Sequence, residues 1–173
     1  MIRTARLALL AAALAAPAQA ATHAFCWVGA NGYRMEGYIA YPDTLAGRVI
    51  TQDEVTGFGI SGWRAERYLG SWSLKDLTPE TTWVLRFDTR AQAFPMGGLP
   101  AEGTYQAWNA NGFVTDCGDP GFGFNGGNQA QDICVDGVFI EESGVPPDTP
   151  LSAAPDTSNP CGPLPMSRNA RRK

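Results

Sequence analysis

Apolar and polar residues alternate with a period of two along much of the first half of the chain. The clearest example is the segment 33–41, where every second position is apolar or small: Tyr33, Met35, Gly37, Ile39 and Tyr41. The positions between them include Arg34, Glu36 and Tyr38. Successive side chains of a strand point to opposite faces, so this pattern predicts a strand with one buried face.

Other short runs of this kind follow, each bounded by turn residues. They cover residues 55–61, 68–74, 82–88, 105–109, 113–117 and 138–141. Long helical stripes are absent from the sequence, and only brief helical turns are expected, near 51–55 and 76–81. The sequence therefore predicts an all-β fold, an antiparallel β-sandwich or small barrel of about seven or eight short strands.

The pair Asn111-Gly112 lies between two of these runs, 105–109 and 113–117. Asn and Gly tolerate the positive φ angles that a two-residue hairpin turn requires. The sequence therefore predicts a hairpin in which 105–109 and 113–117 are neighbouring strands.

Glycine and proline are concentrated in the second half of the chain. The sequence has 20 Gly and 13 Pro, and 22 of these 33 residues fall between 91 and 167. The same stretch holds nine Asp or Glu residues and no Lys or Arg, whereas 168–173 is basic. We expect a signal segment at 1–20, one β-rich domain at 21–142 and a proline-rich extended tail at 143–173 with a basic C-terminus. The acidic body argues against nucleic acid as a partner.

The first twenty residues have the features of a secretory signal peptide. Arg3 and Arg6 give a positive start, residues 7–16 form an apolar run, and a small-x-small cleavage pattern ends at Ala20. The apolar run is too short to cross a bilayer as a helix, which takes about 20 residues. We expect a periplasmic or secreted protein that begins after Ala20, or after Ala24, and has no transmembrane segment.

All four cysteines follow this segment: Cys26, Cys117, Cys134 and Cys161. An even count in an oxidising compartment favours two disulfides, for which three pairings are possible. We expect Cys117 to pair with Cys134, closing a Gly-rich loop, and Cys26 to pair with Cys161, joining the two ends of the chain. No C-x₂₋₄-C pair is present, which argues against a four-cysteine zinc site.

The stretch 35–88 resembles exported bacterial β-domains of the kind found in proteins with a PEP-CTERM sorting tail. The motifs that carry the resemblance are Gly37-Tyr38-Ile39, Pro42-Asp43, Val49-Ile50-Thr51, Val55-Thr56-Gly57-Phe58, Ser73-Leu74-Lys75-Asp76-Leu77 and the alternating run 83–88. The resemblance implies an extracytoplasmic all-β domain of no established chemistry, and it carries over no catalytic residues. The chain departs from the pattern at its C-terminus, which has no PEP motif and no apolar helix before the basic cluster.

His23 is the only histidine, and it would be the third residue of the processed chain if cleavage follows Ala20. A free α-amine, two deprotonated amides and an imidazole at position three form a square-planar nitrogen set, the geometry that Cu(II) and Ni(II) favour. The sequence therefore offers a copper hypothesis at His23. The alternative is an unstructured N-terminal residue with no role.

Oxygen ligands for a second metal are concentrated in the Gly-rich segment 116–136. The candidates are Asp116, Asp119, Asn125, Asn128 and Asp132. Calcium accepts carboxylate and amide oxygens, but no recognised calcium-loop spacing is present. A disulfide-closed loop that uses Gly and Asn for its turns explains the same residues. We expect no obligatory cofactor, with calcium or copper as the metals that the sequence could bind.

Two tryptophans are expected outside the core. Trp63 lies beside Gly62 in a predicted loop, and Trp108 lies on the opposite face of its strand from Tyr105. Exposed aromatic rings can stack on a sugar or anchor a protein partner. Trp72 and Trp83 are expected in the core.

The sequence contains no recognisable catalytic arrangement. No Gly-x-Ser-x-Gly motif or P-loop occurs, and the adjacent pairs Asp53-Glu54 and Glu141-Glu142 would point to opposite faces of a strand. We expect a binding or structural module whose partner is a glycan or a protein, bound at the loops 109–137. Two alternatives stay open: a small extracytoplasmic hydrolase that uses carboxylates, and an inhibitor-like module that presents the Cys117 to Cys134 loop.

Overall fold

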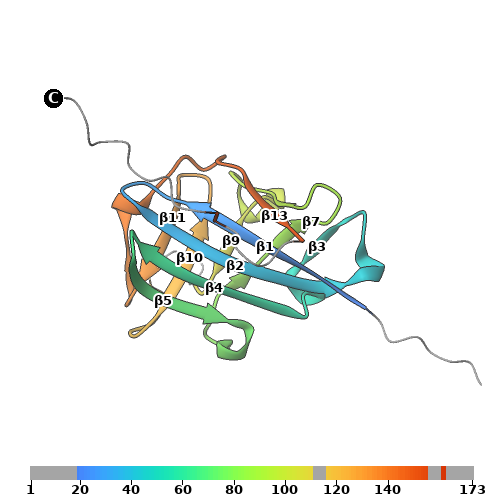
Figure 1. The fold of residues 1–173 in the computed structure, drawn as a ribbon, viewed down its shortest axis with the longest axis horizontal. Helices are drawn as coiled ribbons and strands as arrows, with labels where there is room; N and C mark the ends of the chain where they lie inside the picture. Colours follow the sequence, from blue (N-terminus) through green and yellow to red (C-terminus); the bar gives the residue numbers. More distant parts are fainter. Residues whose placement is uncertain (1–18, 111–115, 156–160, 163–173) are drawn as a thin grey trace, which may run out of the picture.

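The computed structural model of the chain describes residues 19–110, 116–155 and 161–162. The predicted signal segment up to residue 18, the Asn111-Gly112 turn and the basic C-terminal cluster lie outside the described residues. The prediction of an all-β fold is confirmed, because the regular elements are strands and short 3₁₀ turns. The strands form two antiparallel sheets (Figure 1).

The larger sheet is built around four long strands that are neighbours in the order β1, β2, β4, β5 and lie in front in Figure 1. Beyond β1 the sheet continues with the short strands β13, β8, β7 and β3. The eight strands are β1 (Ala20–Val28), β2 (Tyr33–Pro42), β3 (Val49–Thr51), β4 (Gly57–Arg64), β5 (Arg67–Ser73), β7 (Arg86–Asp88), β8 (Ala93–Phe94) and β13 (Leu151–Ala154).

The smaller sheet has five strands in the order β12, β11, β10, β9, β6, and β9 to β11 lie behind the long strands in Figure 1. Its strands are β6 (Trp83–Val84), β9 (Gln106–Trp108), β10 (Phe122–Gly126), β11 (Gln131–Val135) and β12 (Val138–Phe139).

The described part of the chain has five short 3₁₀ turns between its strands: Asp43–Leu45, Gln52–Glu54, Leu74–Asp76, Pro100–Glu102 and Glu141–Ser143. The turn at Gln52–Glu54 agrees with the helical turn expected near 51–55. The other expected turn lies earlier than predicted, because the Asp76 carboxylate accepts hydrogen bonds from the Ser73 backbone and hydroxyl and caps a turn that begins at Leu74.

The long antiparallel pairing of β1 with β2 decides which side chains face the smaller sheet. The core-facing pairs include His23 with Ile39, Phe25 with Gly37, and Trp27 with Met35. Paired residues lie on the same face of a sheet. The intervening residues of β1, β2, β4 and β5 therefore form the opposite side, which we call the outer face.

The two sheets pack against each other through an aromatic core around Trp108. The Trp108 ring centroid lies 5.5 Å from that of Phe25, 4.9 Å from Phe58, 5.1 Å from Phe94 and 4.8 Å from Phe124. Trp108 is fully buried. The prediction that it lies outside the core is therefore wrong. All three residues of β9 are buried, so alternation along this strand does not separate an exposed face from a covered one.

The hairpin prediction around β9 is also wrong. β9 pairs with β10 on one side and with β6 on the other, so both of its edges are occupied by strands other than the predicted one. Residues 116 and 117, the described end of that predicted strand, are not in a strand.

Both predicted disulfides are present. Cys26 is bonded to Cys161, and Cys117 is bonded to Cys134. The chain between Cys134 and Cys161 contributes β13, which pairs with both β1 and β8. Leu151 and Ala153 face the core from this strand. The β domain therefore reaches into the segment 143–173 that the sequence suggests is an extended tail.

Candidate functional site

The outer face of the long strands is a continuous surface whose residues are placed by the pairing register. Glu36 of β2 pairs with Cys26 and with Ser61, and Ser61 pairs with Ser71. Two residues away along β2, Tyr38 pairs with Ala24 and with Gly59. Other residues of the face are Thr22, Arg34, Gly57, Trp63, Tyr68 and Ser73.

Tyr38 lies flat over β4 because its neighbours there are glycines. A Cβ placed on Gly59 would be 2.8 Å from Cε1 of the Tyr38 ring, and one on Gly57 would be 3.5 Å from Cε2. The two edges of the ring therefore rest above two glycines of one strand. The tyrosine is 42% exposed, so the other face of its ring is open to solvent.

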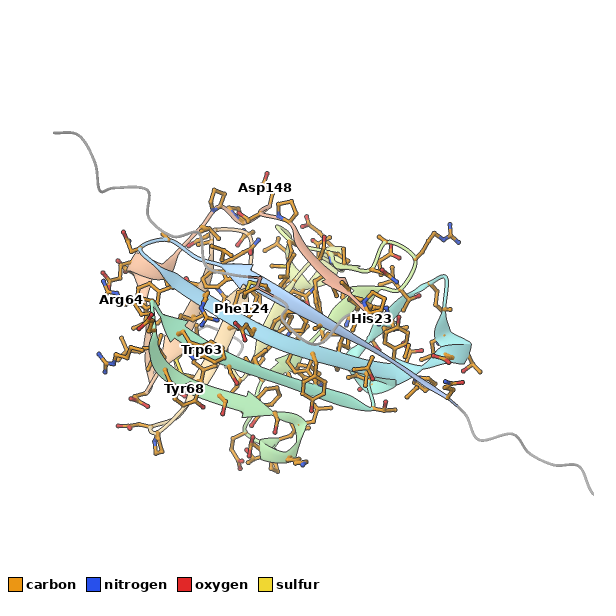
Figure 2. The ribbon with its side chains drawn as sticks, in the orientation of Figure 1. His23, Trp63, Arg64, Tyr68, Phe124 and Asp148 are labelled. Carbon is orange, nitrogen blue, oxygen red and sulfur yellow. A yellow bond between two sulfur atoms is a disulfide. The ribbon has the colours of Figure 1, made fainter. Side chains whose placement is uncertain are left out.

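Trp63 marks the other end of this face. It lies in β4, directly after a register shift between Gly62 and Trp63 in the pairing with β5, and not in a loop as predicted. The guanidinium of Arg34 lies 4.5 Å from the Trp63 ring, and Tyr68 contacts the ring edge-on with centroids 5.9 Å apart. Figure 2 shows Trp63 and Tyr68 together at one end of the sheet. These two contacts hold the half-buried indole in place.

A shallow hollow of about 670 Å³ lies between these aromatic residues. Small and hydroxylated side chains form its floor, among them Gly59, Ser61, Ser71 and Ser73. Tyr38, Trp63, Glu36 and Asp76 lie around the same hollow. The arrangement offers flat aromatic surfaces together with hydrogen-bonding groups, which is the composition of a ligand site.

The charged groups of this hollow are already engaged. Glu36 forms a salt bridge with Arg34. The Asp76 carboxylate accepts hydrogen bonds from the Ser73 backbone N–H at 3.0 Å and from its hydroxyl at 2.9 Å. The hollow therefore presents paired charges and neutral hydroxyls to a ligand.

A second hollow, of about 630 Å³, lies between β5 and the loop that leads into β10. Four carboxylates line it: Asp76, Glu80, Asp116 and Asp136. Asp116 accepts a hydrogen bond from the backbone of Gly118, and Asp136 accepts one from Gly121. Asp116, and Asp76 on Ser73, therefore cap turns, whereas Asp136 joins two segments of the chain. Their geometry serves local structure and does not point to a paired acid and base.

The adjacent acidic pairs are held in the same way. Asp53-Glu54 and Glu141-Glu142 lie in 3₁₀ turns and not in strands. The Glu54 carboxylate accepts a hydrogen bond from the Thr51 backbone, and Glu142 accepts one from the Tyr33 hydroxyl at 2.6 Å. The Glu54 carboxylate therefore fixes a turn, and that of Glu142 joins a turn to β2.

The predicted calcium residues do not form one site. Asp116 and Asp119 precede β10, whereas Asn128 lies in the turn after it. The strand between them spans about 13 Å at ~3.3 Å per residue. Asn125 and Asp132 pair across β10 and β11 near the end of β10 that leads to Asn128. Among the residues that the structure describes, no group of three or more His, Cys, Asp or Glu is arranged to hold a metal.

Asp132 is the carboxyl with a strongly shifted pKa. Burial raises the pKa of Asp132 to about 6, and a hydrogen bond from Asn125 opposes the shift. The Asn125 amide nitrogen lies 3.5 Å from Asp132 Oδ1, while the buried Asn125 Oδ1 has no partner. The cost of burying the charge outweighs this single long hydrogen bond, so the folded protein favours the neutral acid.

Replacing Asp132 with Asn is expected to stabilise the protein at pH 8 by about 1 kcal/mol and to have little effect at pH 4. A carboxyl whose pKa is raised by folding stabilises the folded state while it is protonated. That contribution is complete below about pH 4, its pKa when unfolded, and is lost as the pH rises through about 6. Urea unfolding of wild type and Asp132→Asn at both pH values measures the difference. Asp119→Asn, at an exposed acid, is the control; an equal effect of Asp132→Asn at both pH values would contradict the assignment.

His23 lies inside a central strand and not at a free chain end. Its ring stacks on Tyr41 with centroids 5.6 Å apart, and Nε2 lies 3.2 Å from the side-chain nitrogen of Gln92. Burial lowers the pKa of this imidazole. The backbone of residues 21–23 pairs with β2, so a copper site would require these amides to leave the sheet. The structure therefore does not assemble the nitrogen set that the sequence suggests.

The remaining aromatic predictions have different outcomes. Trp72 is buried, as predicted, and Trp83 is half-buried against Phe58 of the core. Tyr38 is a site residue that the sequence reasoning left out. The available signal was its place on the polar side of the predicted strand 33–41, where an exposed aromatic ring is unusual.

Comparisons of the chain with protein-family models, with curated proteins and with solved structures find no match. The described residues contain no helix that is long and apolar enough to cross a membrane. The two disulfides fit an oxidising environment.

Proposed function

We propose that this protein is a binding module of an extracytoplasmic compartment and that its ligand lies on the outer face. One observation carries the proposal: three exposed or half-exposed aromatic side chains lie on one face of one sheet, where Tyr38 and Trp63 line a shallow hollow and Tyr68 packs against the edge of Trp63. A folded domain rarely leaves such rings grouped on its surface unless they contact a partner.

The strands that hold these rings make the surface rigid. Tyr38 and Trp63 lie within long paired strands, and their rings rest against glycines or against Arg34 and Tyr68. Rigid aromatic side chains lose little conformational entropy when they bind, so the same contacts give a higher affinity. This supports a preformed binding surface.

Binding is favoured over catalysis by the state of the acids in the hollow. Glu36 is paired with Arg34, and Asp76 is occupied by Ser73. A general acid or base needs a group that is free to exchange a proton with the substrate. The export part of the proposal is supported by the predicted signal segment, by the resemblance of 35–88 to exported β-domains and by the two disulfides.

Replacing Trp63 with Ala is expected to weaken ligand binding at least tenfold, about 1.4 kcal/mol, while the free energy of unfolding falls by about 1 kcal/mol. The probes are soluble neutral polysaccharides, anionic polysaccharides and a displayed random-peptide library, each measured with wild type and variants. Ser61→Arg, which fills the hollow without removing an aromatic ring, should have a similar effect on binding.

Val138→Ala is the matched control, because Val138 is an exposed apolar residue of the smaller sheet. It should leave binding unchanged. Binding that survives both Trp63→Ala and Ser61→Arg, or no binding to any of the three probe classes, would overturn the proposal. Turnover of a bound probe would show an enzyme instead.

A further inference from the structure

We infer that the ligand of the outer face is a neutral polysaccharide chain that runs from Tyr38 to Trp63 across β2 and β4. This inference rests on the proposed function and specifies its ligand. Three features of the face support it: the spacing of the aromatic rings, the flat setting of Tyr38 and the balance of charge in the hollow.

The spacing of the rings requires an extended ligand. Tyr38 pairs with Gly59, and Trp63 pairs with Arg34, so the two aromatic positions are four residues apart on both β2 and β4. At ~3.3 Å per residue this offset is about 13 Å along the strands. A single sugar ring is too short to reach both positions, whereas a chain of linked rings can contact both and cover the hydroxylated floor between them.

The setting of Tyr38 suits the face of a pyranose ring. One face of the tyrosine rests on Gly57 and Gly59, and the other is directed to solvent. The C–H groups on one face of a pyranose carry a slight positive charge and pack on the negative face of an aromatic ring. The glycines thus turn an ordinary surface tyrosine into a flat platform.

The charges of the hollow favour a neutral chain over an anionic or a cationic one. Arg34 is bound to Glu36, and Asp76 is capped onto Ser73. Beside these groups the floor offers the hydroxyls of Ser61 and Ser71, which both donate and accept hydrogen bonds. An anionic polymer would meet two carboxylates and one guanidinium that is already paired. The hydroxyls of a neutral polysaccharide match the floor without breaking a salt bridge.

A protein partner fits this floor less well. Protein interfaces bind most strongly where an apolar or aromatic anchor fills a desolvated pocket. Here the hollow is shallow and has Gly59, Ser61, Ser71 and Ser73 among its lining residues, so it offers no deep pocket for such an anchor.

Binding is measured by affinity gel electrophoresis and by titration calorimetry, with galactomannan, glucomannan, xylan and mixed-linkage β-glucan as the neutral probes. Alginate, polygalacturonate and the random-peptide library are the other probes. We expect the processed wild-type protein to bind at least one neutral polysaccharide, with a loss of tenfold or more in Tyr38→Ala and in Trp63→Ala. Oligosaccharides of that polymer should bind more tightly with increasing length until they reach both rings, after which the affinity should level off.

Two glycine variants test the platform itself. Gly59→Ala brings a methyl group into the Tyr38 ring and should lower the affinity several-fold by tilting it. Gly57→Ala places its methyl group at ordinary contact distance from the same ring and should lower the affinity less than Gly59→Ala does, while Val138→Ala, on the smaller sheet, is the control that should leave it unchanged. Both glycine variants remain in a strand conformation that Ala adopts, so their melting temperatures show whether the fold is intact.

The outcomes separate the two proposals. Binding confined to anionic polysaccharides or peptides, with the same dependence on Tyr38 and Trp63, overturns the neutral-chain inference and supports the proposed binding function. Affinity for a neutral chain that does not depend on its length overturns the two-position geometry, and affinity that Gly59→Ala leaves unchanged overturns the role of Tyr38 as a platform. Failure of every probe class to bind through this face overturns both.

Discussion

Removing the disulfide between Cys26 and Cys161 is expected to lower the free energy of unfolding by about 5 kcal/mol, against about 3 kcal/mol for the disulfide between Cys117 and Cys134. A disulfide restricts the unfolded chain, and the restriction grows with the length of the loop that it closes. The sequence separations are 135 and 17 residues. The double variants Cys26→Ala/Cys161→Ala and Cys117→Ala/Cys134→Ala should be compared by urea unfolding, with both cysteines of the pair replaced so that no free thiol remains.

The loss of unfolding free energy should be larger for the Cys26–Cys161 variant than for the Cys117–Cys134 variant, because its closure is the longer one. The long closure joins β1 to the chain that follows β13, and β1 and β13 are neighbours in the larger sheet. If the Cys117–Cys134 variant were the less stable of the two, local packing of the Gly-rich loop would matter more than chain closure. Cys26 lies on the outer face and pairs with Glu36. Wild-type protein in reducing agent should therefore also show whether the ligand surface survives without its neighbouring disulfide.

The sequence predicts β2 well because this strand has one buried and one open face, but it leaves out the long strand β1, since Ala20–Val28 is absent from the predicted strands. Tyr33–Pro42 alternates over its whole length, and its core-facing residues are those that the alternation selects. β9 differs, because all of its residues are buried. A period of two therefore predicts neither the burial of Trp108 nor the residues that surround it. β13 has four residues and alternates only between Leu151, Ser152 and small alanines, a signal too weak to identify a strand that lies beside β1.

The candidate site depends on pairing between strands, which the sequence does not specify. Trp63 is recognisable as a candidate, but its contact with Tyr68 of β5 depends on the register shift after Gly62. Tyr38 becomes a platform only because the pairing sets Gly59 opposite it. The disulfide pairing, in contrast, could be predicted, since a short loop and a closure of the two ends are the simplest way to use four cysteines. Strand alternation and the lengths of disulfide loops can be read from the sequence. The residues that lie opposite each other on neighbouring strands follow only from the pairing register, which the sequence does not reveal.

Replacing Trp108 with Ala is expected to lower the free energy of unfolding by about 4 kcal/mol. The indole is fully buried between the two sheets, where it contacts Phe25 and Phe58 of the larger sheet and its cross-strand neighbour Phe124 of the smaller one. Its removal leaves a cavity that strands held in a sheet cannot close. Urea unfolding measures the loss, and a change of less than about 1 kcal/mol would show that the ring does not join the sheets.

Trp108→Phe is the matched control for this prediction. The indole nitrogen of Trp108 is buried without a hydrogen-bond partner, so phenylalanine removes an unsatisfied donor while it keeps most of the aromatic volume. We expect a loss of about 1 to 2 kcal/mol. Comparison with Trp63→Ala then separates the two roles that tryptophan has in this protein. Loss at Trp108 should weaken the fold and leave the affinity of the remaining folded fraction unchanged, whereas loss at Trp63 should weaken binding in a protein that still unfolds cooperatively near the wild-type midpoint.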